Sequence, residues 1–323
     1  MDKLQKKPII AIIIPCYNEE EVLPETAKRL TSKLQMLINN QIINEKSKIL
    51  FVDDGSSDNT WDLIEKYHAE NPLLASGLKL AGNKGHQNAL LAGMLEIKEY
   101  VDAIVSIDAD LQDDIDVIDK MIEKYKAGCE IVYGVRADRK KDNFIKRATA
   151  QGFYNLLRML GVKIIYNHAD FRLMGRKALD ALAQYDEVNL FLRGIIPLLG
   201  FKTGIEYYAR SERFAGKSKY PLHKMIKLAI DGITSFSIKP IRFITLLGIF
   251  ILIISIAMII YYITRYFQGH TVIGWATIAC SIWGIGGLIL FSIGITGEYI
   301  GKIYLETKQR PRYHIEKMLM LKE

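Results

Sequence analysis

The chain has 323 residues, half of them hydrophobic, with 43 basic and 36 acidic side chains and a formal net charge of +7. These values exclude an intrinsically disordered chain, a collagen-like chain and a small disulfide scaffold. Residues 243–263 and 272–296 contain no charged side chain, which excludes a purely soluble enzyme as well, and the length favours about two folding units.

Short apolar runs alternate with longer amphipathic stretches between residues 8 and 135. The runs predicted to form strands are residues 9–14, 48–52, 77–80, 103–107 and 130–133. The stretches predicted to form helices are residues 21–38, 58–69, 87–99 and 117–127. This alternation predicts an α/β fold with a mainly parallel sheet and helices on both faces. Open sheets of this kind bind ligands beyond the carboxyl ends of their strands, so the residues that follow each strand are candidate site residues.

Polar motifs follow four of the predicted strands. They are Pro15-Cys16-Tyr17-Asn18-Glu19-Glu20, Asp53-Asp54-Gly55-Ser56-Ser57-Asp58, Gly82-Asn83-Lys84-Gly85-His86 and Asp108-Ala109-Asp110-Leu111-Gln112-Asp113. The second motif is also a favourable turn and helix N-cap, so by itself it does not indicate a ligand. Asp108 and Asp110 are more informative, because two carboxylates one residue apart repel each other unless they share a cation. Hard oxygen ligands suit Mg²⁺ or Mn²⁺, which usually bind one or two carboxylates plus substrate phosphates, so the implied ligand is a nucleotide diphosphate.

Other nucleotide-binding patterns are missing from the sequence. It contains no Gly-x-x-x-x-Gly-Lys-Ser/Thr loop, which excludes a P-loop NTPase, and no dinucleotide fingerprint follows the first predicted strand. Cys16, Cys129 and Cys280 lack metal-type spacing, and we interpret them as the reduced thiols of a cytoplasmic environment.

The two uncharged segments are long enough to span a membrane. As helices they would measure about 32 and 38 Å, against a hydrocarbon core of about 30 Å. A pair of buried core helices is the alternative, but uncharged runs of this length with so short a connection disfavour it. Lysines and arginines precede the first span and follow the second, whereas the connection of residues 264–271 carries only Arg265. The positive-inside rule therefore predicts that both ends lie in the cytoplasm and the connection outside.

Residues 221–240 lead into the first span. Their apolar side chains recur at helical spacing between lysines, which is typical of core packing or of an amphipathic helix at the membrane surface, and the neighbouring span favours the second. The basic residues beside the spans account for the net positive charge by attraction to anionic lipid, so no nucleic-acid partner is expected.

Three of the motifs, taken in chain order, resemble the family-2 glycosyltransferases, which have a GT-A fold; these are residues 13–20, 52–60 and 108–113. Later segments resemble the polyisoprenyl-phosphate glycosyltransferases, namely Asp170-Phe171-Arg172-Leu173-Met174 and residues 191–194, 213–220, 297–306 and 310–312. This subgroup includes dolichol-phosphate mannose synthase and the bacterial bactoprenol-phosphate glucosyl- and N-acetylglucosaminyltransferases. The resemblance covers essentially the whole chain and implies a nucleotide-sugar-binding GT-A domain followed by a two-helix transmembrane hairpin.

The resemblance also implies roles for individual residues. Those matched to the nucleoside of a sugar donor are Pro15, Tyr17, Glu19 and Asp53. Those matched to the metal and the donor phosphates are Asp108, Asp110, Gln112 and Arg136, and Asp170 matches the catalytic position. Those matched to the phosphate of the acceptor are Arg193, Arg213, Ser218 and Lys219. Residues 83–88 depart from the commoner family pattern, which has Phe at the second place, and we interpret His86 as a helix-start residue.

A lipid phosphate acceptor would make modest chemical demands on these side chains. The second pKa of such a phosphate is about 6, so at pH 7 it is already mostly a dianion and needs no strong base. Positioning and charge balance are then expected to dominate, with arginine side chains binding phosphate in bidentate fashion. We therefore expect Asp170 to orient Arg213 and Lys219 rather than to abstract a proton.

The sequence thus predicts four regions: a cytoplasmic GT-A domain (residues 1–220), an interfacial helix (221–240), a transmembrane hairpin (241–297) and a cytoplasmic tail (298–323). The predicted function is inverting transfer of one sugar from a UDP-sugar to undecaprenyl phosphate at the cell membrane, with Mg²⁺ or Mn²⁺ as cofactor. The sugar is N-acetylglucosamine or glucose, and the lipid-linked product would serve cell-envelope glycosylation.

Three alternatives to this function stay open. The first is a GDP-mannose donor, and the second is a processive polysaccharide synthase, whose Gln-x-x-Arg-Trp motif is absent. The third is a non-catalytic membrane scaffold, against which the presence of both Asp108 and Asp110 argues. A homo-oligomer is compatible with the sequence.

Overall fold

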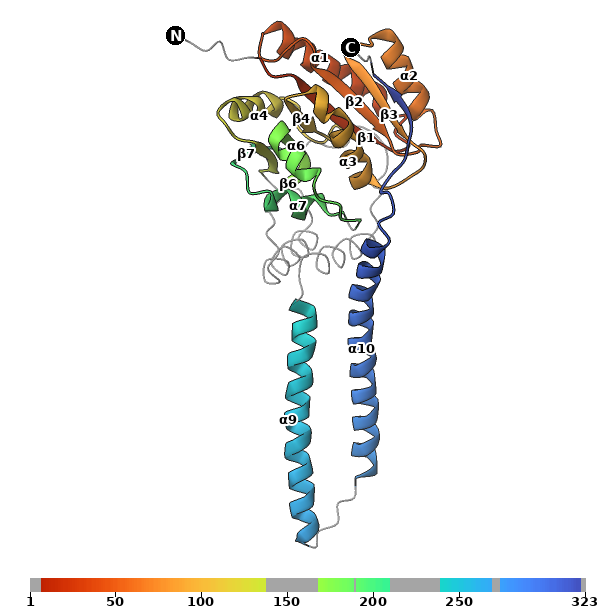
Figure 1. Ribbon diagram of the computed structural model, residues 1–323, viewed down its shortest axis with the longest axis vertical. Helices are drawn as coiled ribbons and strands as arrows, with labels where there is room; N and C mark the ends of the chain where they lie inside the picture. Colours follow the sequence, from red (N-terminus) through yellow and green to blue (C-terminus); the bar gives the residue numbers. More distant parts are fainter. Residues whose placement is uncertain (1–6, 138–167, 189, 210–238, 269–273, 321–323) are drawn as a thin grey trace.

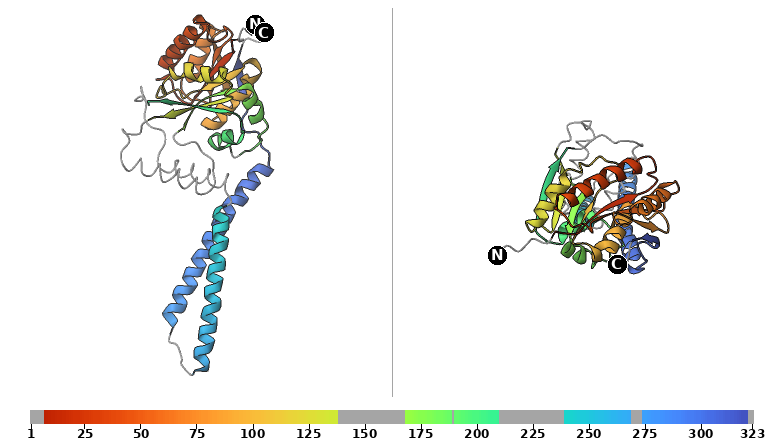
Figure 2. Two further views of the ribbon diagram at one scale, coloured as in Figure 1. Left: turned by 90° about the vertical axis from the view of Figure 1, so that its left-hand side faces the viewer. Right: turned by 90° about the horizontal axis from the view of Figure 1, so that it is seen from above.

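The computed structural model describes residues 7–137, 168–188, 190–209, 239–268 and 274–320. An α/β domain lies at one end of the molecule, and two long helices extend from it (Figures 1 and 2). The strands are β1 (Ile10–Cys16), β2 (Lys48–Asp53), β3 (Ala75–Leu80), β4 (Ala103–Ser106), β5 (Ile131–Arg136), β6 (His168–Gly175), β7 (Thr203–Tyr208) and β8 (Ile315–Leu319). The helices are α1 (Leu23–Asn39), α2 (Thr60–Glu70), α3 (His86–Ile97), the 3₁₀ turn η1 (Lys98–Tyr100), α4 (Val117–Lys126), α6 (Arg176–Leu182), α7 (Leu192–Leu198), α9 (Lys239–Phe267) and α10 (Trp275–Thr307).

The elements predicted between residues 8 and 135 are all present, and their ends differ from the prediction by a few residues. β1 shows why the prediction was reliable, because its seven residues are all buried and four of them are isoleucine. Branched apolar side chains of this kind favour a strand that is covered on both faces.

The described strands form one eight-stranded sheet in the order β7-β5-β6-β4-β1-β2-β3-β8. The pairs β1–β2, β1–β4, β2–β3 and β5–β7 are parallel. β6 is antiparallel to both β4 and β5, and β8 is antiparallel to β3. The predicted α/β fold with a mainly parallel sheet is therefore confirmed, while β6, β7 and β8 are strands that the sequence analysis did not predict.

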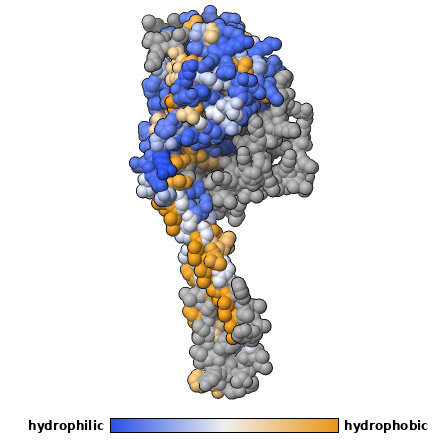
Figure 3. Space-filling view, turned by 90° about the vertical axis from the view of Figure 1, so that its right-hand side faces the viewer, coloured by the Kyte–Doolittle hydropathy of each residue, from blue (hydrophilic) through white to orange (hydrophobic). Residues whose placement is uncertain are grey.

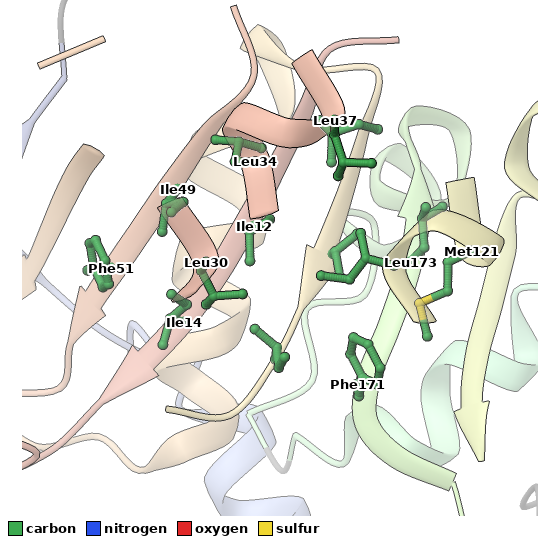
Figure 4. Close-up of a cluster of buried hydrophobic side chains, with 14 of the residues drawn as sticks. Ile12, Ile14, Leu30, Leu34, Leu37, Ile49, Phe51, Met121, Phe171 and Leu173 are labelled. Atoms are coloured by element: carbon green, nitrogen blue, oxygen red, sulfur yellow. The ribbon is translucent and has the colours of Figure 1, made fainter. Parts of the chain in front are cut away.

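Helices cover both faces of the sheet, as predicted. On one face, α1, α2 and α4 bury a cluster in which Leu30 and Leu34 of α1 pack near Ile12 and Ile14 of β1 (Figure 4). On the other face, α3, α6 and α7 bury a second cluster. Gly93 of α3 is part of the close packing there, because a Cβ atom at this position would lie 2.8 Å from a methyl group of Ile13. This tight contact fixes α3, and with it the residues at its start.

Two described helices, α9 and α10, are long and apolar enough to cross a membrane, with candidate spans at Pro240–Met258 and Gly284–Thr307. Their large apolar side chains are exposed, Phe243 by 65% and Leu290 by 72%. In Figure 3 hydrophobic side chains line the described parts of α9 and α10, whereas mostly hydrophilic ones cover the α/β domain. This exposure sets them apart from core helices, whose apolar side chains are buried.

The structure adds detail at the predicted boundaries. α9 begins at Lys239, and the rest of the predicted interfacial helix, residues 221–238, lies outside the described residues. α10 extends to Thr307, and the chain then returns to the α/β domain, where β8 pairs with β3 (Figure 1). The predicted tail therefore contributes the last strand of the sheet.

Candidate functional site

The polar motifs meet at one edge of the sheet. β1, β2 and β4 run in parallel, so the loops that follow them lie at the same edge. β6 runs in the opposite direction and pairs Arg172 with Ser106 of β4, which brings its early residues to this edge as well. Asp170 therefore lies next to the end of β4, close to Asp108.

The loops after β1 and β2 are joined by hydrogen bonds. The amide of Asn18 donates to Ser56 Oγ at 3.0 Å, and Asn18 Oδ1 accepts the amide of Ser57 at 2.8 Å. The amide of Glu19 donates to Thr60 Oγ1 at 2.9 Å.

The residues predicted to hold a nucleoside lie around the ends of β1 and β2. Pro15 pairs with Val52 in the sheet, Asp53 is buried at the end of β2, and Tyr17 is 41% exposed. The structure thus brings Pro15, Tyr17, Glu19 and Asp53 together at the ends of β1 and β2 and on the loop that follows β1.

Asp54 connects the second loop to the start of α3. Its carboxylate accepts the amides of Lys84 at 2.7 Å and Gly85 at 2.9 Å. Gly55 adopts a positive φ of 68°, and a Cβ atom there would lie 2.6 Å from the backbone of Gly82. Only glycine fits so close an approach. The Asp54–Gly55 pair therefore fixes the loop that places His86 at the beginning of α3.

Asp108 and Asp110 lie on the loop after β4. The carbonyl of Ala109 accepts the hydroxyl of Thr26 at 2.7 Å, which ties the loop to α1. Leu111 has a positive φ of 55°, a conformation that costs a non-glycine residue about 1 kcal/mol or more. Such strain is often found in functional loops. Asp110 Oδ1 accepts the amide of Gln112 at 3.2 Å, so the second carboxylate and Gln112 are held together.

Negative charge is concentrated around Asp108. Burial raises the pKa of this carboxyl group to about 6; the nearby His86 lowers it, and the carboxylates of Asp113, Asp170 and Asp110 raise it. His86 Nε2 lies 3.5 Å from Asp108 Oδ1 and 3.5 Å from Asp170 Oδ2, between the two carboxylates. Burial alone would lower the pKa of His86, but its hydrogen bond to Asp170 and the charge of Asp108 raise it above the usual value.

This donor set fits a divalent cation that is shared with a ligand. Among the described residues, no group of three His, Cys, Asp or Glu side chains converges as a complete metal site. Two carboxylates in a loop with excess negative charge supply only part of a coordination sphere, which suits a metal such as Mg²⁺ that takes its remaining ligands from phosphates and water. Asp108 and Asp110 would hold such an ion, with Gln112 beside them.

Asp170 lies between two arginines. Arg193 at the start of α7 forms a bidentate pair with it, with Nε 3.2 Å from Oδ1 and Nη2 2.9 Å from Oδ2, and Arg172 Nη2 also donates to Oδ1. Burial would raise the pKa of Asp170, but Arg193, the hydrogen bond from His86 and Arg172 together hold it well below its usual range. A carboxylate in this state is a poor general base. Its geometry is that of a group that orients arginines.

Arg172 is fully buried in β6. Its Nε also donates to the backbone carbonyl of Asp170 at 3.4 Å, and within the described part of the chain its Nη1 has no hydrogen-bond partner. Burial lowers the pKa of its guanidinium group. A buried charge is stable only when paired, so Arg172 and Asp170 require each other. The sequence carried a signal for this pair, namely a single arginine within the apolar run Phe171-Arg172-Leu173-Met174.

A second arginine site lies beside the loop that carries Asp108 and Asp110. Arg136 Nη2 donates to Asp113 Oδ1 at 3.3 Å, and Arg136 Nε donates to the hydroxyl of Tyr208 at 3.3 Å. The Tyr208 hydroxyl in turn donates to Asp113 Oδ1. Burial raises the pKa of Asp113, and within the described residues its Oδ2 atom has no partner. Arg136 was predicted to face donor phosphates, and the structure holds it next to the Asp108 loop on a buried carboxylate that the sequence analysis did not single out.

The structure brings most of the predicted site residues together at this edge. Arg213, Ser218 and Lys219 lie outside the described residues, so their proximity to Asp170 stays a prediction. α3 begins at His86, as interpreted from the sequence, but its contacts with both carboxylates were not anticipated. Asp54, Asp113 and Arg172 lie within the motifs quoted from the sequence, but they were missed as site residues because their roles depend on tertiary contacts.

Comparison with known proteins identifies relatives along most of the chain. The model of the family "Glycosyl transferase family 2" matches residues 11–183. An uncharacterized glycosyltransferase of Bacillus subtilis (strain 168) is 55% identical over 312 residues, which cover 97% of this chain and 92% of that protein. A bactoprenol glucosyl transferase of Shigella phage SfX is 40% identical over 312 residues, which cover 95% of this chain and 98% of that protein.

Among solved structures, a mannosyltransferase from Pyrobaculum calidifontis in complex with GDP-Man and Mn²⁺ resembles this chain with a TM-score of 0.46 and 17% identity. The match covers 71% of this chain and 62% of that one.

Proposed function

Because this chain belongs to glycosyl transferase family 2, we propose that it transfers a single sugar from a nucleotide diphosphate sugar to a polyprenyl phosphate. The chain is a glycosyltransferase, and its α/β domain has the GT-A fold. The name of the phage relative, which matches almost the whole chain, supports a bactoprenol-type lipid acceptor. The observation that carries the proposal is the arrangement of Asp108 and Arg193 on either side of Asp170 and His86. In this proposal Asp108 is a ligand of the cation and Arg193 a ligand of the acceptor phosphate, so both roles fall within one site.

The donor occupies the loops after β1, β2 and β4. Pro15, Tyr17, Glu19 and Asp53 surround the nucleoside, and Asp108 and Asp110, with Gln112 beside them, hold a divalent cation, Mg²⁺ or Mn²⁺. When bound, that cation would offset the negative charge that the leaving nucleotide gains as the anomeric bond breaks. Arg136 lies close enough to this loop to add a second positive charge toward the diphosphate, in exchange for one of its contacts with Asp113.

The acceptor phosphate lies on the other side of Asp170. The phosphate is already mostly a dianion at pH 7, so direct attack on the anomeric carbon, with inversion, needs no proton transfer. Asp170 instead keeps the fork of Arg193 in place through two hydrogen bonds. Arg213, Ser218 and Lys219 complete the phosphate site in this proposal. UDP is the proposed nucleotide, and N-acetylglucosamine or glucose the proposed sugar.

An assay of nucleotide release tests this function. We expect the purified full-length chain to release UDP from UDP-glucose or UDP-N-acetylglucosamine only when undecaprenyl phosphate and a divalent cation are present. A panel that includes GDP-mannose decides between the donors, since release of GDP instead of UDP would favour the mannosyl alternative. Repeated addition of sugar to one lipid would indicate a processive synthase. If no donor in the panel yields a free nucleotide, the result would favour the alternative of a non-catalytic membrane scaffold.

Membrane topology gives a second, independent test. We propose that α9 and α10 cross the membrane as a hairpin, that residues 221–240 lie at its surface, and that the catalytic domain faces the cytoplasm. A cysteine placed at Gly269, in the connection, is then expected to react with an impermeant thiol reagent added to intact cells. A cysteine at Lys308 should react only after the cells are permeabilised. The reverse labelling pattern would contradict the positive-inside argument and would separate the site from cytoplasmic sugar nucleotides.

A further inference from the structure

The C-terminal motif at residues 297–312 has no role in the chemistry proposed above. Residues 297–307 of this motif form the last turns of α10, and residues 308–312 follow the end of the helix at Thr307. Gln309 then adopts a positive φ of 47°, and the chain turns toward the sheet. β8 pairs with β3, and Lys317 forms an ion pair with Glu65 of α2 at 2.6 Å. The end of α10 is thus fastened to the catalytic domain by the segment that follows it (Figure 1).

Two side chains of this motif contact the chain segment 185–188. Glu306 Oε2, in the last turn of α10, accepts the amide of Val188 at 2.9 Å. Arg312 Nη2 donates to the backbone carbonyl of Tyr185 at 2.7 Å and lies 3.3 Å from the carboxylate of Asp186. The Arg312 side chain is 14% exposed, whereas Asp186 is 96% exposed. The shielded bond to the carbonyl is therefore the more important of the two, because exposed ion pairs contribute little.

The segment 185–188 leads directly to the acceptor side of the site. The amide of Leu190 donates to the carbonyl of Val188 at 2.9 Å, and the amide of Leu192 donates to Gln87 Oε1 at 2.8 Å. Arg193 follows, with its bidentate pair to Asp170. The stretch that carries Arg193 is therefore held at its beginning by the end of α10 and at its end by Gln87, the residue next to His86.

We propose that Glu306 and Arg312 are positioning residues for the acceptor site. They fix residues 185–188 to the end of α10 and to the segment that follows it, and thereby set the place of Arg193 relative to Asp170. This inference rests on the proposed function, in which Arg193 binds the acceptor phosphate. A lipid phosphate is confined to the membrane surface, so an arginine that must meet it benefits from a rigid connection to a membrane-spanning helix. Holding a binding group in one geometry is a common source of catalytic efficiency.

The test compares matched pairs of variants of the full-length chain in vesicles of phosphatidylethanolamine and phosphatidylglycerol that contain undecaprenyl phosphate. Glu306→Met removes the acceptor for the Val188 amide, whereas Glu306→Gln keeps an oxygen at the same position. Arg312→Met removes the donor to Tyr185, whereas Arg310→Met removes an exposed arginine two residues away. Initial rates give KM and kcat for the lipid and KM for the sugar nucleotide. Hydrogen–deuterium exchange of peptides spanning residues 183–192 reports on the segment itself, independently of activity.

We expect Glu306→Met and Arg312→Met each to lower kcat/KM for the lipid about tenfold, the scale of one lost hydrogen bond to a charged group, with the KM for the donor unchanged. Exchange over residues 183–192 should rise in both. Glu306→Gln should recover most of the loss, and Arg310→Met should behave as the wild type.

Two results would overturn the inference. The first is that Glu306→Met has the same kinetic constants and the same exchange as Glu306→Gln, and that Arg312→Met likewise matches Arg310→Met. The other is a loss of donor binding that accompanies the loss of transfer, which would point to a general effect on folding. The proposed function fails separately, if the wild type transfers no sugar to the lipid while the two Met variants still increase exchange over residues 183–192.

Discussion

Replacing Asp108 or Asp110 with alanine is expected to lower sugar transfer by about 10²-fold or more, the scale on which other electrostatic groups of active sites act. In the proposed mechanism the two carboxylates hold the cation that offsets the charge of the leaving nucleotide. The structure supports this role, because burial and then the nearby carboxylates of Asp113, Asp170 and Asp110 disfavour the charge of Asp108 and raise its pKa to about 6, which a bound cation would offset. The measurement is the transfer rate at saturating lipid, together with Mn²⁺ binding by electron paramagnetic resonance.

Asp114→Ala provides the control for this pair. Asp114 lies in the same loop, and its carboxylate accepts the amide of Asp116 at 3.0 Å. We expect this variant to bind Mn²⁺ and to transfer sugar nearly as the wild type does. Transfer that continues at full rate in EDTA, or an Asp108→Ala variant that binds Mn²⁺ with unchanged affinity, would contradict the assignment of the metal site.

Asp170→Ala is expected to abolish transfer and to lower the free energy of unfolding by about 3–5 kcal/mol, because it leaves the buried Arg172 without its carboxylate. Arg193 would lose both of its hydrogen bonds in the same variant. Asp170→Asn keeps one acceptor oxygen and should retain folding and part of the activity. Thermal unfolding and single-turnover transfer measure the two effects separately.

The pH dependence distinguishes positioning from general-base catalysis. The pKa of Asp170 is well below the ordinary value of 3.8, so the carboxylate stays ionised from pH 8 to pH 5. Its contribution to stability is fully present above about pH 4 and is lost only as the pH falls further, because a depressed pKa favours the ionised folded state. We therefore expect no loss of wild-type transfer from Asp170 between pH 8 and pH 5. The acceptor phosphate and Asp108 both titrate at about pH 6, so a fall in wild-type activity below that pH belongs to these groups. A folded Asp170→Asn variant that is nearly inactive at every pH would indicate a true base.

A double variant separates the role of Asp170 in stability from its role in transfer. Asp170→Leu combined with Arg172→Met replaces the buried ion pair with apolar groups, an exchange that proteins often tolerate. We expect this variant to fold about as stably as the wild type and to remain inactive, since Arg193 has lost its anchor. Substantial transfer by a folded double variant would show that Arg193 does not depend on Asp170.

Much of this molecule follows from local patterns in the sequence. The apolar runs and helical periodicities before residue 135 predicted five strands and four helices, because buried parallel strands and amphipathic helices each have a characteristic spacing. The motifs at the strand ends predicted a common site, since the carboxyl ends of parallel strands share one edge. The uncharged segments predicted the long helices α9 and α10 by length and composition alone.

The remaining strands could not be read from local patterns. β6 contains two charged residues, Asp170 and Arg172, which are unusual in a buried strand, so the sequence did not predict a strand there. The two charges are tolerated because they form an ion pair within the sheet. β8 is a short edge strand with exposed residues, and its pairing with β3 joins segments of the chain that are far apart in sequence. In both cases long-range pairing stabilises a segment whose own propensity is weak.

The sequence by itself determined the fold class, the family and the residue types of the site. Tertiary structure alone decided which charges meet there. Arg213 and Lys219, the expected partners of Asp170, lie outside the described residues, so that expectation stays a prediction. Within the described residues Asp170 contacts Arg172, Arg193 and His86, which the sequence did not indicate. His86 is 84 residues away from Asp170 in the chain, and Glu306 is 118 residues away from Val188. Such pairs leave no periodic trace in the sequence, because an ion pair or a single hydrogen bond depends on distance in space and on burial rather than on spacing along the chain.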